Sequence, residues 1–188
     1  MRATLQHNEE ERLEALRQYE ILDTLPEKDF DDLTALASQI CGTPIALISL
    51  IDRDRQWFKS KVGFGATETS RETAFCAQAI RQRDLFIIRD TLHDERFARN
   101  PLVTSDPHIR FYAGAPLATP EGQTLGTLCV IDRVPRDLSA EQEEALRALG
   151  RQVMTQLELR RQSARLSQVN EELEREAAER RRSEQRYD

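Results

Sequence analysis

The sequence IALISLI occupies residues 45–51, and it is followed by polar DRD (52–54) and by QWFKSKV (56–62). A continuous apolar run that is rich in β-branched residues and too short for an independent helix predicts a buried strand. The polar triplet predicts a turn, and residues 56–62 predict a second strand. Because the connection between the two strands is too short for a parallel crossover, we expect them to pair antiparallel.

Three more strands are expected further along the chain. Residues 86–88 predict a brief one, and residues 110–117 and 125–131 flank the turn sequence TPEG (119–122), which predicts a hairpin. Residues 90–109 contain two X-Pro pairs and predict mostly loop, with one helical turn near 95–98. With helices before, between and after the strands, the pattern predicts an α+β fold in which helices flank a central antiparallel β-sheet.

Helical patterns surround these strands. Asn8 and Glu11 form a capping-box-like pair for a first helix that ends before Pro26, and a short helix is expected over residues 74–80. A second helix is expected over residues 29–41, ended by Gly42. Its apolar residues recur with helical spacing and predict one buried face, made of Leu33, Leu36, Ala37 and Ile40.

The C-terminal quarter of the chain predicts one long helix, with Ser139 and Gln142 as its capping box. We therefore divide the chain into a domain at residues 1–138 and a coiled-coil signalling helix at 139–188. Apolar residues spaced by three, four and seven predict the seam of a parallel homodimer. The seam residues are Leu146, Leu149, Val153, Leu159, Leu166, Val169 and Leu173. The six-residue step after Val153 predicts a register break near Gln156, and a lone charged helix is the alternative.

Composition excludes several classes of function. The net charge is −6, so binding to a nucleic-acid backbone is not expected, and the basic run at 180–182 is interleaved with glutamates. No apolar run approaches the roughly 18–20 residues that cross a bilayer, and the N-terminus does not read as a secretory signal. Three widely spaced cysteines predict neither a disulfide framework nor a zinc site. We expect a cytoplasmic protein that binds no membrane.

Many short sequences occur in an order that is typical of one family. They are RLEAL (12–16), ILDTLP (21–26), FDDL (30–33), ISLIDRDRQWFKS (48–60), FCA (75–77), DERF (94–97), NPLV (100–103), IRFYAGAPL (109–117) and GTLCVID (126–132). Together they resemble the GAF domains found at the N-termini of bacterial sensor histidine kinases and diguanylate cyclases, over residues 8 to 157. The run RRRSEQRY (180–187) resembles the segment that often precedes a PAS domain.

The resemblance implies a ligand pocket between the sheet and the short helix and loop after the second strand. Its lining would be Trp57, Phe75, Cys76, Asp90, Phe97, Ile109, Phe111 and Tyr112, with Asp90 as a polar anchor. A few polar groups in an apolar concavity suit a small molecule. The alternative is that these side chains simply form a core, since aromatic and aliphatic residues are what cores are made of.

The resemblance does not extend to the subtypes with known cofactors. Asp94-Glu95 lacks the preceding Asn-Lys and Phe pattern of cyclic-nucleotide-binding members, and Cys76 is followed by Ala77 rather than by the His of bilin-binding members. His93 and His108 lie in a loop, which makes an axial haem ligand improbable. The cofactor is therefore unknown, with cyclic nucleotide, covalent bilin and haem each disfavoured.

No catalytic motif is recognisable in the sequence, so an enzyme is not expected. Some GAF proteins reduce free methionine sulfoxide with grouped cysteines, but Cys41, Cys76 and Cys129 do not match that grouping. Any kinase or cyclase activity would lie beyond residue 188. We predict a sensory input domain of a bacterial signalling protein, such as a two-component system, that binds a small molecule or partner. The alternative is a ligand-free dimerisation spacer.

Overall fold

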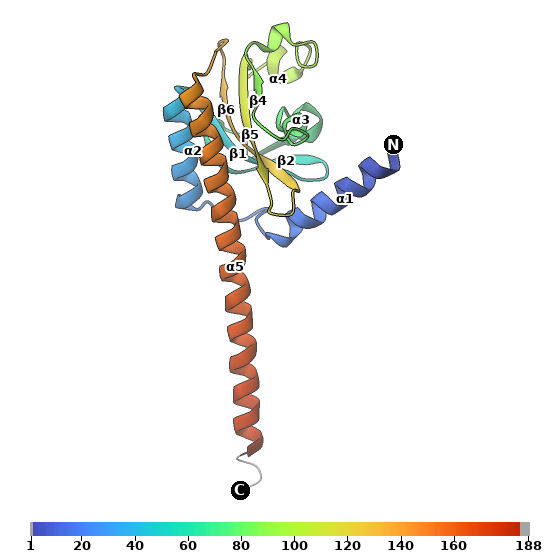
Figure 1. The fold of residues 1–188 in the computed structure, drawn as a ribbon, viewed down its shortest axis with the longest axis vertical. Helices are drawn as coiled ribbons and strands as arrows, with labels where there is room; N and C mark the ends of the chain where they lie inside the picture. Colours follow the sequence, from blue (N-terminus) through green and yellow to red (C-terminus); the bar gives the residue numbers. More distant parts are fainter. Residues whose placement is uncertain (1, 185–188) are drawn as a thin grey trace.

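The computed structural model describes residues 2–184, and it describes side chains for residues 8–182. The described residues form one six-stranded sheet in the order β3-β2-β1-β6-β5-β4, with neighbouring strands antiparallel (Figure 1). The strands are β1 (Ile45–Ile51), β2 (Arg55–Val62), β3 (Glu68–Ser70), β4 (Phe86–Ile88), β5 (Phe111–Ala118) and β6 (Thr124–Asp132). The predicted antiparallel sheet is confirmed. Strand β3 was not predicted, because its residues Glu68–Ser70 are polar and contain no apolar run.

Helices cover both faces of the sheet. They are α1 (Arg2–Gln18), α2 (Lys28–Cys41), α3 (Cys76–Ala79), α4 (Pro101–Thr104) and α5 (Ala140–Glu184). α2 and α5 pack side by side on one face, whereas α3, α4 and their loops cover the other (Figure 1). Two separate hydrophobic cores result, one on each face of the sheet. Among residues 2–184, none of the helices combines the length and the apolar character that a bilayer span requires.

The buried face of α2 differs from the predicted one. The helix begins and ends close to the predicted residues, and Gly42 follows it in the left-handed conformation with φ 63°. Its buried residues, however, are Phe30, Thr34, Ala37 and Cys41, while Leu36 and Ile40 are exposed. The prediction overlooked Thr34. Its hydroxyl donates to the Phe30 carbonyl oxygen, so the donor is satisfied although the side chain is buried.

Helix α1 also corrects the sequence analysis. It begins at Arg2 rather than after Asn8, so Asn8 does not cap it. Leu13 and Leu16 are both buried, Leu16 in the core beneath α2 and α5. These two leucines are consequently not free to join a helical bundle with a second copy.

Helix α5 begins as predicted, because Ser139 and Gln142 exchange reciprocal hydrogen bonds between side chain and backbone. Its first turns then belong to the core of the domain, and Leu146 and Val153 are fully buried against the sheet. The globular body therefore extends past residue 138 into the helix. The assignment of Leu146 and Val153 to a dimer seam was wrong, because both side chains are fully buried within one chain. Leu149 is partly buried against the same core.

The predicted register break near Gln156 has the same explanation. The residues before it and the residues after it belong to two different stripes of one helix, so the six-residue step is not a discontinuity of a coiled coil. The last residues of the RRRSEQRY segment, 185–187, lie outside the described residues.

Candidate functional site

The structure separates the predicted pocket residues into two sets. Successive residues of a strand point to opposite faces, so Phe111 and Tyr112 in β5 enter different cores. Trp57 and Phe111 pack beneath α2 and α5, and their assignment to the pocket was wrong for this reason. The residues brought together on the α3 and α4 face are Phe75, Cys76, Phe97, Ile109 and Tyr112.

Aromatic rings fill the space that the resemblance assigns to a ligand. Phe75 stacks on Phe97 with ring centroids 4.4 Å apart and planes 8° apart, and on Tyr112 at 5.3 Å. Phe86 packs at an angle against Phe97 and Tyr112. Gly114 makes room for the Tyr112 ring, since a Cβ at residue 114 would lie 2.4 Å from the Tyr112 hydroxyl oxygen. This arrangement favours the alternative that these side chains form a core.

Beneath the rings lies a buried polar group of side chains, which we call the thiol cluster: Ser49, Cys76, Tyr112, Thr127 and Cys129. The two sulfur atoms are 3.8 Å apart. The Tyr112 hydroxyl donates to Cys76 Sγ at 3.2 Å and lies 3.4 Å from Thr127 Oγ1. Ser49 Oγ is buried and makes no hydrogen bond of ordinary geometry. The cluster is therefore polar, buried and incompletely satisfied in hydrogen bonds.

The two thiols of the cluster have different acidities. Burial raises the pKa of Cys76, but hydrogen bonds from Cys129, Thr127 and Tyr112 outweigh burial and lower that pKa to about 7. Burial and the neighbouring Cys76 raise the pKa of Cys129 well above its ordinary value. Cys76 is thus the thiol that ionises first, with Cys129 as its hydrogen-bond donor.

The thiol cluster could not be predicted from local sequence patterns, because 53 residues separate its two cysteines. Cys76 begins α3, and Cys129 lies in β6 opposite Leu47 of β1 and Gly114 of β5. The available signal is the alternation in β6, which points Thr127 and Cys129 to the face that α3 covers. That face can be assigned only once the position of α3 is known.

Asp90 is placed apart from the rings and serves the structure of its own loop. Its carboxylate accepts two hydrogen bonds from Arg110, at 3.0 and 2.9 Å, and caps the turn at residues 91–93 through the Leu92 amide. The hydrogen bonds from Arg110 lower the pKa of Asp90 to about 2. An anchor for a ligand would need a free acceptor, whereas this carboxylate is already engaged.

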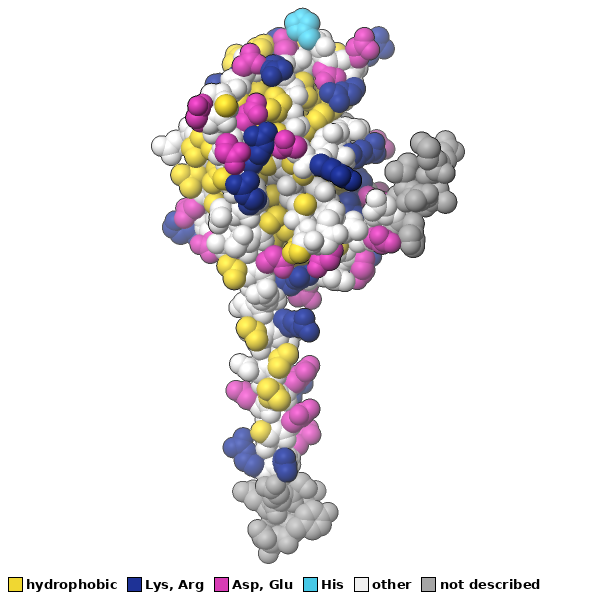
Figure 2. Space-filling view, in the orientation of Figure 1, with side chains coloured by type: hydrophobic (Ala, Val, Ile, Leu, Met, Phe, Trp, Pro, Cys, Tyr) yellow, Lys and Arg dark blue, Asp and Glu magenta, His cyan; other side chains and the backbone are white. Residues whose placement is uncertain are grey.

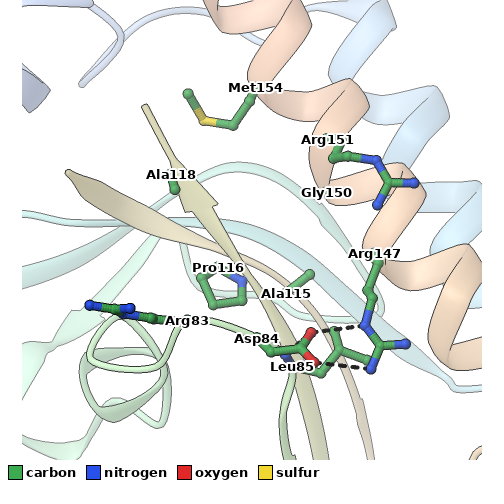
Figure 3. A pocket seen from close by; sticks show the side chains of 10 residues that line it. All are labelled: Arg83, Asp84, Leu85, Ala115, Pro116, Ala118, Arg147, Gly150, Arg151 and Met154. Carbon is green, nitrogen blue, oxygen red and sulfur yellow. Dashed lines mark hydrogen bonds and ion pairs between the residues drawn. The ribbon is translucent and has the colours of Figure 1, made fainter. Parts of the chain in front are cut away.

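A surface cleft of about 300 Å³ lies on the opposite side of the sheet, between β5 and α5 (Figure 3). Arg147 spans it and donates to Asp84 at 2.8 and 3.3 Å. The helix comes very close to the strand here, because a Cβ at Gly150 would lie 3.0 Å from the Ala115 Cβ. The cleft is therefore a seam of helix–sheet packing that is bridged by an ion pair.

The described part of α5 beyond the body carries an exposed apolar stripe. Its members, which we call the outer stripe, are Leu159, Leu166, Val169 and Leu173. Each exposes between 43% and 67% of its surface, and Figure 2 shows apolar side chains along the stalk. Exposed leucines at seven-residue spacing are typical of a helix that pairs with another helix. α2 adds two exposed apolar residues to the same molecule, Leu36 and Ile40.

Comparison with known families agrees with this architecture. A model of the GAF domain matches residues 26–157, which include the sheet and the buried turns of α5. The chain belongs to the GAF domain family. No group of three or more His, Cys, Asp or Glu side chains suited to a metal ion occurs in the part of this GAF domain that the structure describes.

Several proteins of known name are similar to this chain. A cyclic di-GMP phosphodiesterase of Pseudomonas aeruginosa is 45% identical over 139 residues, which cover 74% of this chain and 24% of that protein. The match thus spans about a quarter of the relative. The GAF domain of an Acinetobacter phosphoenolpyruvate-protein phosphotransferase has a TM-score of 0.59 at 17% identity, covering 79% of this chain and 92% of that one.

A solved structure of an enzyme shares the fold as well. The free methionine-R-sulfoxide reductase of Neisseria meningitidis, in complex with its substrate, has a TM-score of 0.59 at 15% identity. The similarity covers 78% of this chain and 87% of the reductase. At this level of identity the comparison shows a common fold and carries no statement about activity.

Proposed function

We propose that this GAF domain is the sensory input module of a bacterial signal-transduction protein and that α5 transmits its state as a parallel homodimer. The observation that carries the proposal is the outer stripe of α5. Leu159, Leu166 and Leu173 repeat every seven residues, and Val169 lies between the last two. Pairing two copies in register would remove these side chains from water, which is favourable by about 25 cal/mol per Å² of apolar surface.

The outer stripe continues upward along the body with smaller residues. Ala145, Ala148, Gln152 and Thr155 occupy the positions that precede Leu159 in the same seven-residue pattern. None of the four is among the fully buried side chains of α5. A second copy of α5 would therefore meet small and polar side chains beside the body and leucines below it.

One helix thus carries both halves of the proposed relay. Its inner side, with Leu146, Val153 and Leu157, is part of the core beneath the sheet. Its outer stripe would be the dimer seam. A change in the packing of the sheet would shift the helix as a unit, since a packed core does not deform continuously.

The nature of the signal has two candidate answers. A small molecule would need space among Phe75, Phe97 and Tyr112, whose rings are in stacking contact. This filled core favours the second candidate. In it, the domain is a dimerising spacer that transmits the state of a partner domain. A reductase of free methionine sulfoxide is less well supported, because Cys76 and Cys129 are wholly buried.

We also propose that this GAF domain regulates an output domain elsewhere in a larger signalling protein. The similarity to a cyclic di-GMP phosphodiesterase supports a place in second-messenger signalling, with this domain preceding a PAS, kinase, cyclase or phosphodiesterase domain. We propose no catalysis within the GAF domain itself. Three free cysteines suit a reducing compartment, which supports a cytoplasmic location.

Native mass spectrometry of the purified chain, compared with its denatured mass, tests the proposal. We expect a dimer at micromolar concentration. A dimer with added non-covalent mass would support ligand sensing and would give the class of ligand. A dimer without added mass would support the spacer. A monomer under conditions that preserve the fold would overturn the relay through α5.

A further inference from the structure

We propose that Cys76 and Cys129 form an oxidisable dithiol, which hydrogen peroxide converts into a disulfide between α3 and β6. The geometry points to this reaction because the two sulfur atoms are already 3.8 Å apart within one buried polar cluster. Formation of a disulfide requires that separation to fall to about 2.05 Å. The inference concerns the body of the domain alone and needs neither a dimer nor a ligand.

The reaction balances in two steps. The Cys76 thiolate attacks one oxygen of hydrogen peroxide, the S–O bond forms as the O–O bond breaks, and the departing hydroxide takes a proton to become water. Cys129 then loses its proton and attacks the sulfur of the sulfenic acid. The S–S bond forms as the S–O bond breaks, and the departing hydroxide takes the proton that Cys129 released and becomes a second water. Two thiols are oxidised and one peroxide is reduced to two waters.

The surroundings assign the first step to Cys76. Tyr112 donates a hydrogen bond to Cys76 Sγ at 3.2 Å and so stabilises the thiolate, which is the nucleophilic form. Cys129 lies in a central strand and acts as the resolving thiol. Cys41 provides an internal contrast, because it lies in the other core, on α2, where burial raises its pKa.

The fold also indicates which partner moves. Cys129 is held in β6 by its neighbours β1 and β5, whereas α3 has only four residues between a tight turn and a loop. Phe75 directly precedes α3 in the sequence and stacks on Phe97, and both rings belong to the core that covers Cys76. Local opening of this short helix would admit the oxidant and would let the sulfur atoms meet.

Oxidation followed by mass spectrometry tests the inference. The reduced, folded chain is treated with hydrogen peroxide near pH 7, quenched, denatured and alkylated with iodoacetamide. We expect a product that is lighter by two hydrogen atoms before alkylation, with a single alkylated cysteine, Cys41, and a linked peptide pair containing Cys76 and Cys129. A reductant should restore all three free thiols.

Matched variants separate the roles. Cys41→Ser should oxidise at the rate of the parent, whereas Cys129→Ala should stop at a sulfenic acid on Cys76 that dimedone traps. Tyr112→Phe should form the disulfide about threefold to tenfold more slowly, because it lacks the donor to the thiolate. Circular dichroism confirms that each variant is folded.

Two results would overturn the inference. One is modification of Cys41 as fast as Cys76 in the folded chain. The other is the absence of the linked peptide while the folded chain resists peroxide. An unchanged oxidation rate in folded Tyr112→Phe would overturn the role assigned to that hydroxyl.

Discussion

Leu157 is 1% exposed and packs beneath the sheet, whereas Leu159, two residues further along α5, is 53% exposed. Two residues turn an α-helix by about 200°, so these leucines lie on nearly opposite sides of it. The helix leaves the body of the domain at this point. The pair marks where apolar packing of α5 against the body ends and where the outer stripe begins, although Arg160 still pairs with Glu27.

Replacing both Leu166 and Leu173 with glutamate should dissociate the proposed dimer. Four like charges would then meet in the seam of a parallel pair, while the body of the domain would be untouched because both side chains are exposed. Sedimentation velocity should show the mass of a monomer, with an unfolding temperature of the body close to that of the parent.

The control for this experiment is Gln168→Glu, which adds a charge to the same part of α5 but outside the outer stripe. It should leave the dimer intact. A double variant that sediments as the parent does would show that Leu166 and Leu173 are not in a seam.

Gly126→Ala should destabilise the domain by about 3 kcal/mol or more, as overpacking against backbone does. A Cβ at residue 126 would lie 1.8 Å from the Ser49 carbonyl oxygen, in the neighbouring strand β1. Urea unfolding, followed by the fluorescence of the single tryptophan Trp57, measures the change.

Gly65→Ala is the matched control, since nothing lies within 4 Å of the added Cβ. Its free energy of unfolding should stay within about 0.5 kcal/mol of the parent. Equal stability of the two variants would mean that β1 and β6 are not packed as closely as described.

These contacts show what the sequence was able to predict. Local patterns predicted β1, β2, β5, β6 and α2 almost to the residue, because hydrophobic period and turn chemistry act over a few residues. They did not predict which face of the sheet each side chain would enter. The face depends on which helix covers it. Trp57 and Phe111 consequently lie in one core and Tyr112 in the other.

The seam and the thiol cluster illustrate the same limit. Val153 and Leu159 look alike in the sequence, yet only Val153 has a sheet to pack on. Cys76 and Cys129 become neighbours only when α3 folds over β6. Long-range placement of this kind is not encoded in local periodicity.

Lys59→Ala should cost about 2 kcal/mol or more of stability. The Lys59 side chain is 0% exposed; its Nζ donates to Thr24 Oγ1 at 2.9 Å and to the Leu25 carbonyl oxygen at 2.6 Å, and it pairs with Glu27. The register of β1 with β2 shifts at Lys59, which lies at a bulge between Phe58 and Ser60. Urea unfolding again gives the free energy.

Two further variants serve as controls for Lys59→Ala. Lys28→Ala removes a lysine that is 82% exposed and paired with Asp32, so it should change stability by less than about 0.5 kcal/mol. Lys59→Met keeps the apolar stem and removes the charge together with the hydrogen-bond donors of Nζ. If Lys59→Ala were as stable as Lys28→Ala, the buried ammonium would contribute nothing.

Protonation of Glu9 should lower the stability of the domain as the pH falls from about 4.5 to about 2. Partial burial raises the pKa of Glu9, but hydrogen bonds from Arg12, at 2.8 and 2.9 Å, and from Arg71, at 2.7 Å, lower it from 4.5 to about 2. A carboxylate whose pKa is lowered by folding stabilises the fold above its unfolded pKa, and this contribution disappears as protonation proceeds toward the folded pKa.

Glu9→Gln should therefore be less stable than the parent by about 1 kcal/mol at pH 7, and the two should converge near pH 2. Urea unfolding across this pH range measures the difference in free energy of unfolding, with Glu14→Gln at an exposed residue as the control. A difference between the parent and Glu9→Gln that does not change with pH would show that ionisation of Glu9 does not link α1 to the domain.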